Sequence, residues 1–265
     1  MGNYLKPRAA AIEAALAGGE VLKRHFGSRM EISFKGELDL VTPADTESES
    51  TIVSLLSRRM PGVTILAEEG GESEGDADRR FIVDPLDGTT NFAHGYPHFA
   101  VSIAYEQEGQ IAVGVVYDPL REELFTAEID QGAFLNGQRL HVSAEGTLAR
   151  ALLVTGFPYD LKDDVAANLR YFNRFMAEVR AIRRDGSAAL DLCYVAAGRF
   201  DGFWEEKLAP WDTAAGSLLV TEASGRVSDI VGDPFSCFGR SVLASNDLLH
   251  DPMLKILNEE IRSEK

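Results

Sequence analysis

Apolar and polar residues alternate between Phe99 and Ile129, and this pattern constrains the fold of the 265-residue chain more than any other feature. The segment VSIAYEQEGQIAVGVVY and the following LFTAEI both alternate, and turn signals separate the runs. Alternation with a period of two is typical of strands, and tight turns join antiparallel neighbours. The sequence therefore predicts an antiparallel meander, which the segment AFLNGQRLHVS continues.

Two helices are predicted before the meander. The first covers about residues 7–26, although Gly18 and Gly19 weaken its middle. The second begins after Thr42, which suits the N-cap, has Pro43 at its first position, and ends at the Pro-Gly pair of SRRMPG. We expect these helices to pack against the antiparallel sheet.

The pattern changes after about residue 150. Predicted helices at 165–179, 187–197 and 213–223, and a terminal helix, alternate with the strand-like segments RAIRR, DGFWE, RVSDI and SVLAS. Such alternation is typical of an α/β arrangement. We therefore expect residues 1–150 to form an α+β part with an antiparallel sheet, and residues 151–265 to form an α/β part.

Charge and composition limit the classes of partner. Hydrophobic residues make up 45% of the chain, as in a globular protein. The formal net charge is -16, so the overall field repels nucleic acid and anionic lipid, and neither is an expected partner. The N-terminus lacks a secretion signal, no apolar run is long enough for a membrane span, and the two cysteines have no metal-ligand spacing, so we expect a cytoplasmic location.

The stretch FIVDPLDGTTNF could form an anion or metal site. Asp84 and Asp87 follow a short apolar run, and Mg²⁺ in proteins prefers carboxylate oxygens together with substrate phosphate. Gly88 permits a positive φ or a close backbone approach, and Thr89 and Thr90 offer hydroxyls and amides to a phosphate or a water. The alternative is that these residues form an Asx turn and a helix cap.

Two further acidic sites favour the metal. Glu68 and Glu69 follow the strand-like VTIL, although a bare Glu pair is more often a solvated strand end than a metal ligand. Asp212 precedes the helical TAAGSLLVTEASG, where an N-cap is the alternative role. Acids at three strand or helix ends are nevertheless typical of a carboxylate metal cluster, because open α/β sheets place ligands at such ends.

The motifs DPLDGTTNF and PWDTAAG, about 125 residues apart, resemble those of the inositol monophosphatase family of Mg²⁺-dependent, lithium-sensitive sugar phosphatases. The segments LAEEGG and DLVTPAD and the predicted meander extend the resemblance over nearly the whole chain. It implies the layered α-β-α-β-α sugar phosphatase fold, a phosphoric monoester hydrolase and, commonly, a homodimer.

The resemblance also implies roles for individual residues. Thr89 and Asp45 would activate the attacking water, and Glu68 would join them as a catalytic residue. Gly88 and Thr89 would hold the phosphate. The implied metal ligands are Glu68, Asp84, the Leu86 carbonyl, Asp87 and Asp212. The implied substrate contacts are Gly186, Ser187, Ala188, Glu205 and Asp212.

Two departures from the family pattern are visible. Ala67 stands where the family often has a glycine before its Glu-Glu pair, which alters no ligand. In the segment FKGELDLVT, the alignment that would place Lys35 near a third metal is uncertain in its spacing.

The predicted reaction is hydrolysis of a phosphate monoester by water that a metal activates. The resemblance implies Mg²⁺ as the cofactor, two or three ions, with Mn²⁺ as a substitute and Li⁺ and Ca²⁺ as inhibitors. Inositol 1-phosphate is the leading substrate, because Glu205 suits a phosphorylated polyol with free hydroxyls. Histidinol phosphate, fructose 1,6-bisphosphate and 3'-phosphoadenosine 5'-phosphate remain alternatives, as does a non-catalytic regulatory or interaction protein.

Overall fold

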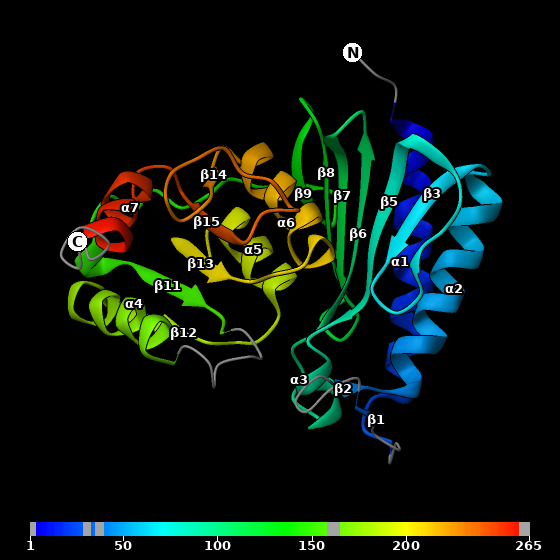
Figure 1. Cartoon of the computed structure of the whole chain (residues 1–265), viewed down its shortest axis with the longest axis horizontal. Helices are drawn as coiled ribbons and strands as arrows, with labels where there is room; N and C mark the ends of the chain where they lie inside the picture. The colour runs from blue at the N-terminus through cyan, green and yellow to red at the C-terminus, as the bar shows by residue number, and fades with distance from the viewer. Residues whose placement is uncertain (1–3, 29–32, 35–39, 158–164, 260–265) are drawn as a thin grey trace.

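The computed structural model describes residues 4–28, 33–34, 40–157 and 165–259 (Figure 1). The helices are α1 (Leu5–His25), α2 (Pro43–Arg59), α3 (Thr89–Ala93), α4 (Val165–Glu178), α5 (Ala188–Ala196), α6 (Pro210–Glu222) and α7 (His250–Glu259), with a 3-10 turn η1 (Leu148–Arg150). The strands of the first half are β1 (Ser33–Phe34), β2 (Leu40–Val41), β3 (Val63–Ala67), β4 (Gly71–Glu72), β5 (Asp76–Asp87), β6 (Ala100–Gln107), β7 (Gln110–Asp118), β8 (Glu123–Glu128), β9 (Gly132–Leu135) and β10 (Gln138–Arg139). Those of the second half are β11 (Leu152–Thr155), β12 (Ala181–Arg183), β13 (Gly202–Glu206), β14 (Arg226–Ser228) and β15 (Ser241–Ser245).

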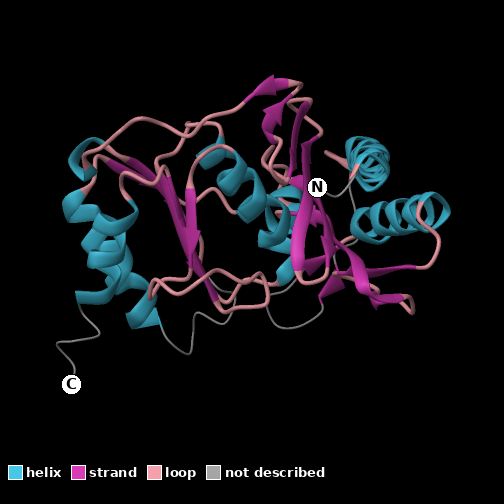
Figure 2. Cartoon of the chain, turned by 90° about the horizontal axis from the view of Figure 1, so that it is seen from above, coloured by secondary structure: helices cyan, strands magenta, loops and turns pink. Residues whose placement is uncertain are grey.

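The described residues form five layers, α-β-α-β-α, which Figures 1 and 2 show from two directions. Helices α1 and α2 cover the outer face of an eight-stranded sheet with the order β10-β9-β8-β7-β6-β5-β3-β4. Helices α5 and α6 lie between this sheet and a five-stranded sheet with the order β12-β11-β13-β15-β14. Helices α4 and α7 cover the far face of the second sheet. This is the layered fold that the resemblance implies.

The meander predicted between residues 99 and 129 is confirmed, because β6, β7 and β8 pair antiparallel in sequence order. The larger sheet is not antiparallel throughout, however, since β3 runs parallel to β5. The predicted alternation after residue 150 is also observed: β11 pairs parallel with β12 and β13, and helices connect these strands.

The side chains of strand β6 pack into two different layers of the fold. Val101 and Ile103 pack toward α1 and α2, whereas the small residues Ala100 and Ala104 face the middle layer. Successive side chains of a strand point to opposite faces, so both faces of a central strand can be apolar. Small side chains on the inner face let α6 approach the sheet closely.

The two glycines of α1 have a packing role. A Cβ atom on Gly18 would lie 2.7 Å from Ile52 Cδ1, and one on Gly19 would lie 2.6 Å from Tyr117 Cδ1. Both glycines are buried. Glycine lowers helix propensity, but a Cβ at these two positions would crowd α2 and β7, against which α1 packs directly.

Helices α5 and α6 join the two halves of the chain in one core. Every residue of α5 is buried, as expected for a helix with a sheet on each side. The apolar cluster around α5 and α6 includes residues from both sheets, so it crosses residue 150. A domain boundary near that residue stays a prediction. None of the described helices combines the length and apolar character needed to cross a membrane.

Candidate active site

A β-bulge brings Asp84 and Asp87 to one face of β5. In a regular strand, residues three positions apart point to opposite faces. Here Asp84 pairs with Ser102 and Asp87 pairs with Ala100, so three steps along β5 oppose two steps along β6. The extra residue reverses the alternation and places both carboxylates together. The strand extends through Asp87, so the two acids lie within it rather than after it.

Asp212 completes a group of three carboxylates. It is the third residue of α6, and its Oδ2 accepts a hydrogen bond from the backbone N–H of Ala209 at 2.7 Å. It therefore lies within the first turn of the helix, not at the N-cap. One carboxylate oxygen of each of Asp84, Asp87 and Asp212 lies within 4.8 Å of the others, which is the arrangement of a potential metal site.

The three carboxylates are electrostatically strained as they stand. Burial, followed by the charges of Glu68, Asp87 and Asp212, raises the pKa of Asp84 well above its usual range. Burial and neighbouring acids likewise raise the pKa of Asp212. Burial raises the pKa of Asp87 to about 6, although hydrogen bonds oppose the shift. A cation bound between these carboxylates would offset the repulsion between their charges.

Glu68 and Leu86 lie at the margin of this group. Glu68 follows β3 directly, and its backbone N–H donates to Val83 O at 3.2 Å. Its charge raises the pKa of Asp84 and Asp212, so it acts on the group without belonging to the tight set of three. The carbonyl of Leu86 lies 3.0 Å from Thr89 Oγ1. Lys35 lies outside the described residues.

The buried Asp45 and the partly buried Thr89 form a hydrogen-bonded pair. Thr89 Oγ1 lies 3.0 Å from Asp45 Oδ1 and 3.0 Å from Leu86 O, and its single proton can serve one of them at a time. Asp45 Oδ2 accepts from the N–H of Thr42 at 2.8 Å and from Thr42 Oγ1 at 2.7 Å, which completes the capping box of α2. Burial raises the pKa of Asp45, and the bonds from Thr42 and Thr89 oppose the shift.

Gly88 occupies a position that suits glycine. Its φ is +97°, and a Cβ would lie 3.0 Å from His98 O and 3.3 Å from Gly186 O. A side chain here would be strained by the backbone conformation and would crowd two neighbouring segments. Gly88 thus allows the chain after Asp87 to turn tightly into α3.

The start of α5 is held by Asp87. Ser187, the N-cap residue, donates its hydroxyl to Asp87 Oδ2 at 2.6 Å, and the N–H of Ala189 donates to the same oxygen at 2.7 Å. One carboxylate therefore belongs to the acid group and also positions the segment that contains Gly186 and Ala188.

A pocket of about 150 Å³ is lined by six of the twelve predicted site residues. Its walls include Asp87, Asp212, Gly186, Ser187, Ala188 and Glu205. A larger hollow of about 670 Å³, beside the β6–β7 turn, α6 and residues 234–238, contains none of the predicted site residues. We therefore place the candidate site at the smaller pocket, because chemistry rather than volume distinguishes it.

Glu205 has an unusual environment in this pocket. Burial raises its pKa to about 8, and the guanidinium of Arg184 opposes this shift. A Cβ on Gly156 would lie 2.1 Å from either carboxylate oxygen of Glu205. Gly156 is therefore a pocket residue that the sequence reasoning missed, and its signal was a glycine at the end of a strand.

Further residues near the pocket, Phe157 and Leu208 among them, were not predicted from sequence. Thr90, which the sequence offered as a contact for a phosphate or a water, also lines the pocket. The side-chain amide of Asn91, within the DGTTN stretch, donates to Asp185 O and His98 O, both at 2.8 Å, and thereby joins two distant segments. Such long-range backbone contacts leave no pattern in the sequence.

Comparisons with known proteins agree with this geometry. A family model described as "Inositol monophosphatase family" matches residues 5–262. An inositol-1-monophosphatase of Mesorhizobium japonicum is 46% identical over 253 residues, 94% of this chain and 95% of the relative. A protein named Nus factor SuhB of Escherichia coli K12 is 44% identical over 254 residues, with 95% of each covered.

Solved structures show the same fold. The extragenic suppressor protein suhB of Bartonella henselae superposes with a TM-score of 0.91 at 45% identity, covering 95% of this chain and 98% of that one. The inositol monophosphatase of Anabaena gives a TM-score of 0.87 at 40% identity, covering 97% and 96%. The layered fold, the acid group and these relatives lead to one conclusion: the chain belongs to the inositol monophosphatase family of metal-dependent phosphatases.

Proposed function

We propose that this protein is a Mg²⁺-dependent phosphatase that hydrolyses the phosphate monoester of a polyol, with inositol 1-phosphate as its preferred substrate. The observation that carries the proposal is the convergence of Asp84, Asp87 and Asp212 from β5 and α6 beside a pocket that also contains Glu205. A metal-dependent phosphatase needs cations beside the phosphate, and the rest of the pocket must select the alcohol of the ester.

The donor set fits hard cations. The side chains of Asp84, Asp87 and Asp212 would hold them, with Glu68 and the carbonyl of Leu86 as further oxygen donors. Oxygen ligands suit Mg²⁺ and Mn²⁺, whereas soft ligands are not part of this group. When bound, such cations polarise the phosphoryl group, acidify a water and offset the charge of the leaving alkoxide.

Thr89 and Asp45 are suited to receive the proton of the attacking water. When Thr89 Oγ1 donates to Asp45 Oδ1, the lone pairs of the hydroxyl oxygen remain available to accept a proton from water. Asp45, whose pKa is raised by burial, is then a stronger base than an exposed aspartate. Proton transfer would run from water to Thr89 and from Thr89 to Asp45.

Glu205 and the start of α5 are suited to a polyol. Because its pKa is about 8, Glu205 is largely protonated at neutral pH and can both donate to and accept from hydroxyl groups. Gly186, Ser187 and Ala188 form the neighbouring wall, where a sugar-like ring would lie. Gly88 and Thr89 offer backbone amides to the phosphate.

The test is a substrate panel with purified protein. Inorganic phosphate release would be measured from inositol 1-phosphate, histidinol phosphate, fructose 1,6-bisphosphate and 3'-phosphoadenosine 5'-phosphate, with Mg²⁺, Mn²⁺ or EDTA, and with Li⁺ or Ca²⁺ added. We expect turnover with Mg²⁺, none with EDTA, inhibition by Li⁺ and Ca²⁺, and the highest kcat/KM for inositol 1-phosphate. A higher kcat/KM for another ester would overturn the substrate, and turnover in EDTA would overturn the metal.

A Thr89→Ala variant tests the proton path. We expect kcat to fall by about 10²–10⁴-fold, the usual contribution of a positioned acid or base, with KM changed much less. Thr90→Ala is the matched control, since Thr90 lines the pocket and, among the described residues, the hydroxyl that hydrogen-bonds to Asp45 Oδ1 is that of Thr89. Equal losses in the two variants would contradict the assigned role of Thr89.

A second function is suggested by the relatives whose printed name is Nus factor SuhB. The name allows a role in protein or nucleic-acid assemblies that does not require turnover. The complete acid group favours catalysis in this chain, and a Thr89→Ala protein would separate the two functions because it removes only the hydroxyl and methyl groups of one partly buried side chain. A cytoplasmic location and a homodimer belong to the same proposal, and sedimentation equilibrium would test the dimer.

A further inference from the structure

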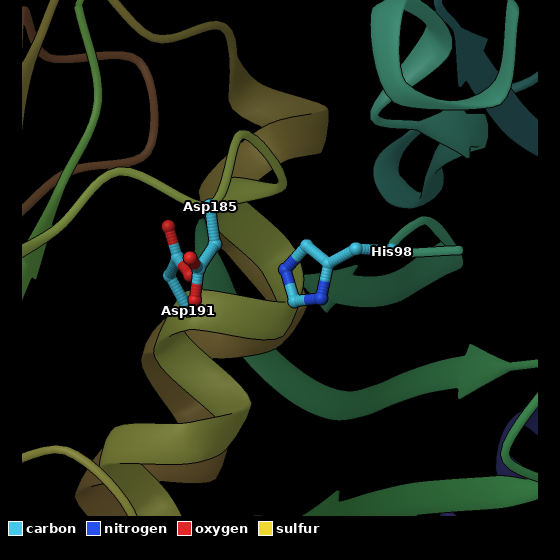
Figure 3. A group of neighbouring side chains, drawn as sticks. All are labelled: His98, Asp185 and Asp191. Atoms are coloured by element: carbon cyan, nitrogen blue, oxygen red, sulfur yellow. The ribbon is translucent and has the colours of Figure 1, made fainter. Parts of the chain in front are cut away.

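A second group of potential ligands lies beside the acid group. It consists of His98, Asp185 and Asp191, each of which offers one ligand atom within 4.8 Å of the others. His98 lies just before β6, whereas Asp185 and Asp191 come from the segment that leads into α5 and from α5 itself. Figure 3 shows the imidazole ring of His98 pointing toward the two carboxylates across the space between these segments.

Two atoms of this group are buried without a partner. His98 is 3% exposed and Asp191 is 1% exposed. Among the described residues, neither His98 Nε2 nor Asp191 Oδ1 has a hydrogen-bond partner. A polar atom that leaves water without a replacement partner costs free energy, and an uncompensated buried carboxylate costs more. An arrangement this unfavourable suggests that a further group normally lies between them.

The two groups are separate but connected. The acid group comprises Asp84, Asp87 and Asp212, and shares no residue with the second group. They are joined by the chain from 185 to 191, because Ser187 within it lines the pocket and donates to Asp87. Asn91 adds a link, since its side-chain amide donates to the backbone carbonyls of His98 and Asp185.

One imidazole and two carboxylates are typical ligands of a borderline transition cation. Zn²⁺ binds His nitrogen and carboxylate oxygen at about 2.0–2.2 Å, so its ligand atoms lie at most about 4.4 Å apart. Small side-chain adjustments would bring the observed atoms within that limit. A hard cation such as Mg²⁺ would prefer an all-oxygen site, and the acid group provides one.

We propose that His98, Asp185 and Asp191 bind a divalent transition cation of the Zn²⁺ class, in a site distinct from the acid group, and that this cation fastens the start of α5 to the chain before β6. The cation would satisfy the two orphaned atoms and offset the charges of the buried Asp191 and the partly buried Asp185. It would also hold the wall of the pocket formed by residues 186–188. Its role is therefore structural support of the pocket.

The protonation states favour such a site. Burial lowers the pKa of His98, so its imidazole is neutral at physiological pH, which is the form that binds metals. Burial and the charges of Asp185, Glu205 and Asp87 raise the pKa of Asp191, and the guanidinium of Arg184 opposes the rise. A cation would displace any proton held there, so binding should release protons.

The experiment measures zinc directly. Wild-type protein would be dialysed against micromolar Zn²⁺ in millimolar Mg²⁺, which keeps hard-cation sites saturated, and bound zinc would be counted by mass spectrometry. We expect one Zn²⁺ per chain and X-ray absorption with the outer-shell scattering of an imidazole. His98→Gln and Asp191→Asn should each weaken binding at least about 100-fold, since loss of outer-shell partners alone costs about 10–100-fold.

Controls make the result decisive. His94→Gln alters a nearby exposed histidine and should bind zinc like the wild type. Circular dichroism in EDTA would verify that each variant folds. Zinc bound equally by His98→Gln, no zinc bound by the wild type, or wild-type zinc without imidazole scattering would each overturn the proposal. The last two outcomes need no variant, so they hold even if a variant fails to fold.

Discussion

Replacing Asp87 by asparagine should have opposite effects on stability and on catalysis. Asp87 is 7% exposed and lies within the acid group, so its negative charge is unfavourable while no cation offsets it. Asparagine has nearly the same shape and keeps an oxygen that can accept from Ser187 and Ala189. The variant therefore removes the charge while leaving the start of α5 in place.

The magnitude follows from the pKa of Asp87, which burial raises from 3.8 to about 6. Because the folded-state pKa is the higher one, ionisation destabilises the folded chain, and this loss develops as pH rises from about 4 through about 6. One pKa unit is about 1.4 kcal/mol, so the charge costs about 3 kcal/mol at pH 7 in the metal-free protein. Asp87→Asn should raise the free energy of unfolding in EDTA by up to that amount and should flatten its dependence on pH.

The assay is urea unfolding at pH 5 and pH 7, in EDTA and in Mg²⁺, together with phosphate release. In Mg²⁺ the wild type should be more stable than the variant, because cation binding stabilises the wild type and the variant binds the cation poorly. Turnover should fall by about 10²–10³-fold or more. Asp233→Asn, at an exposed loop position, is the control and should change neither quantity. A variant that is less stable than the wild type in EDTA, or that keeps its turnover, would refute this account of the acid group.

Three further predictions concern other parts of the molecule. Gly156→Ala places a Cβ 2.1 Å from the carboxylate of Glu205, so we expect the Glu205 side chain to move. The kcat/KM for inositol 1-phosphate should fall about tenfold or more with little change in melting temperature, and an unchanged kcat/KM would argue against a substrate role of Glu205. Gly114→Ala places a Cβ 2.6 Å from a backbone carbonyl of α6 and should cost about 1–3 kcal/mol in thermal unfolding, whereas Gly146→Ala, which meets nothing within 4 Å, should cost much less. Burial lowers the pKa of His250 to about 4, so as pH falls from about 6.5 toward 4 the unfolded chain gains a proton that the folded chain excludes, and up to about 3 kcal/mol of stability is lost. His250→Gln should therefore reduce the dependence of the free energy of unfolding on pH, measured by urea unfolding between pH 7 and pH 5, and an identical dependence would contradict the mechanism.

Local features were predictable because they depend on neighbouring residues. Thr42 and Pro43 start α2 as their cap and first-turn preferences predict, and the alternation of the meander matches β6, β7 and β8. The order of helices and strands after residue 150 follows from the change in periodicity. These features need only the chain geometry of a few residues.

The acid group was predictable only in part. The motif containing Asp84 and Asp87 pointed to a metal, but their spacing alone would place them on opposite faces of a strand. The bulge opposite Ser102 and Ala100 reverses that alternation, and it is a property of the register between β5 and β6. Asp212 reaches the same place because α6 packs between the two sheets.

By itself the sequence determined the elements, the family resemblance and the residue types of the site, since these are written in short patterns and motifs. The tertiary structure alone decided which side chains meet. His98 and Asp191 are 93 residues apart and share no motif, yet the packing of α5 against the first sheet brings them into one group. Within the described residues, His98 Nε2 and Asp191 Oδ1 have no hydrogen-bond partner there. The physical reason is that a cluster drawn from several layers depends on the register and packing of whole elements, which no local pattern specifies.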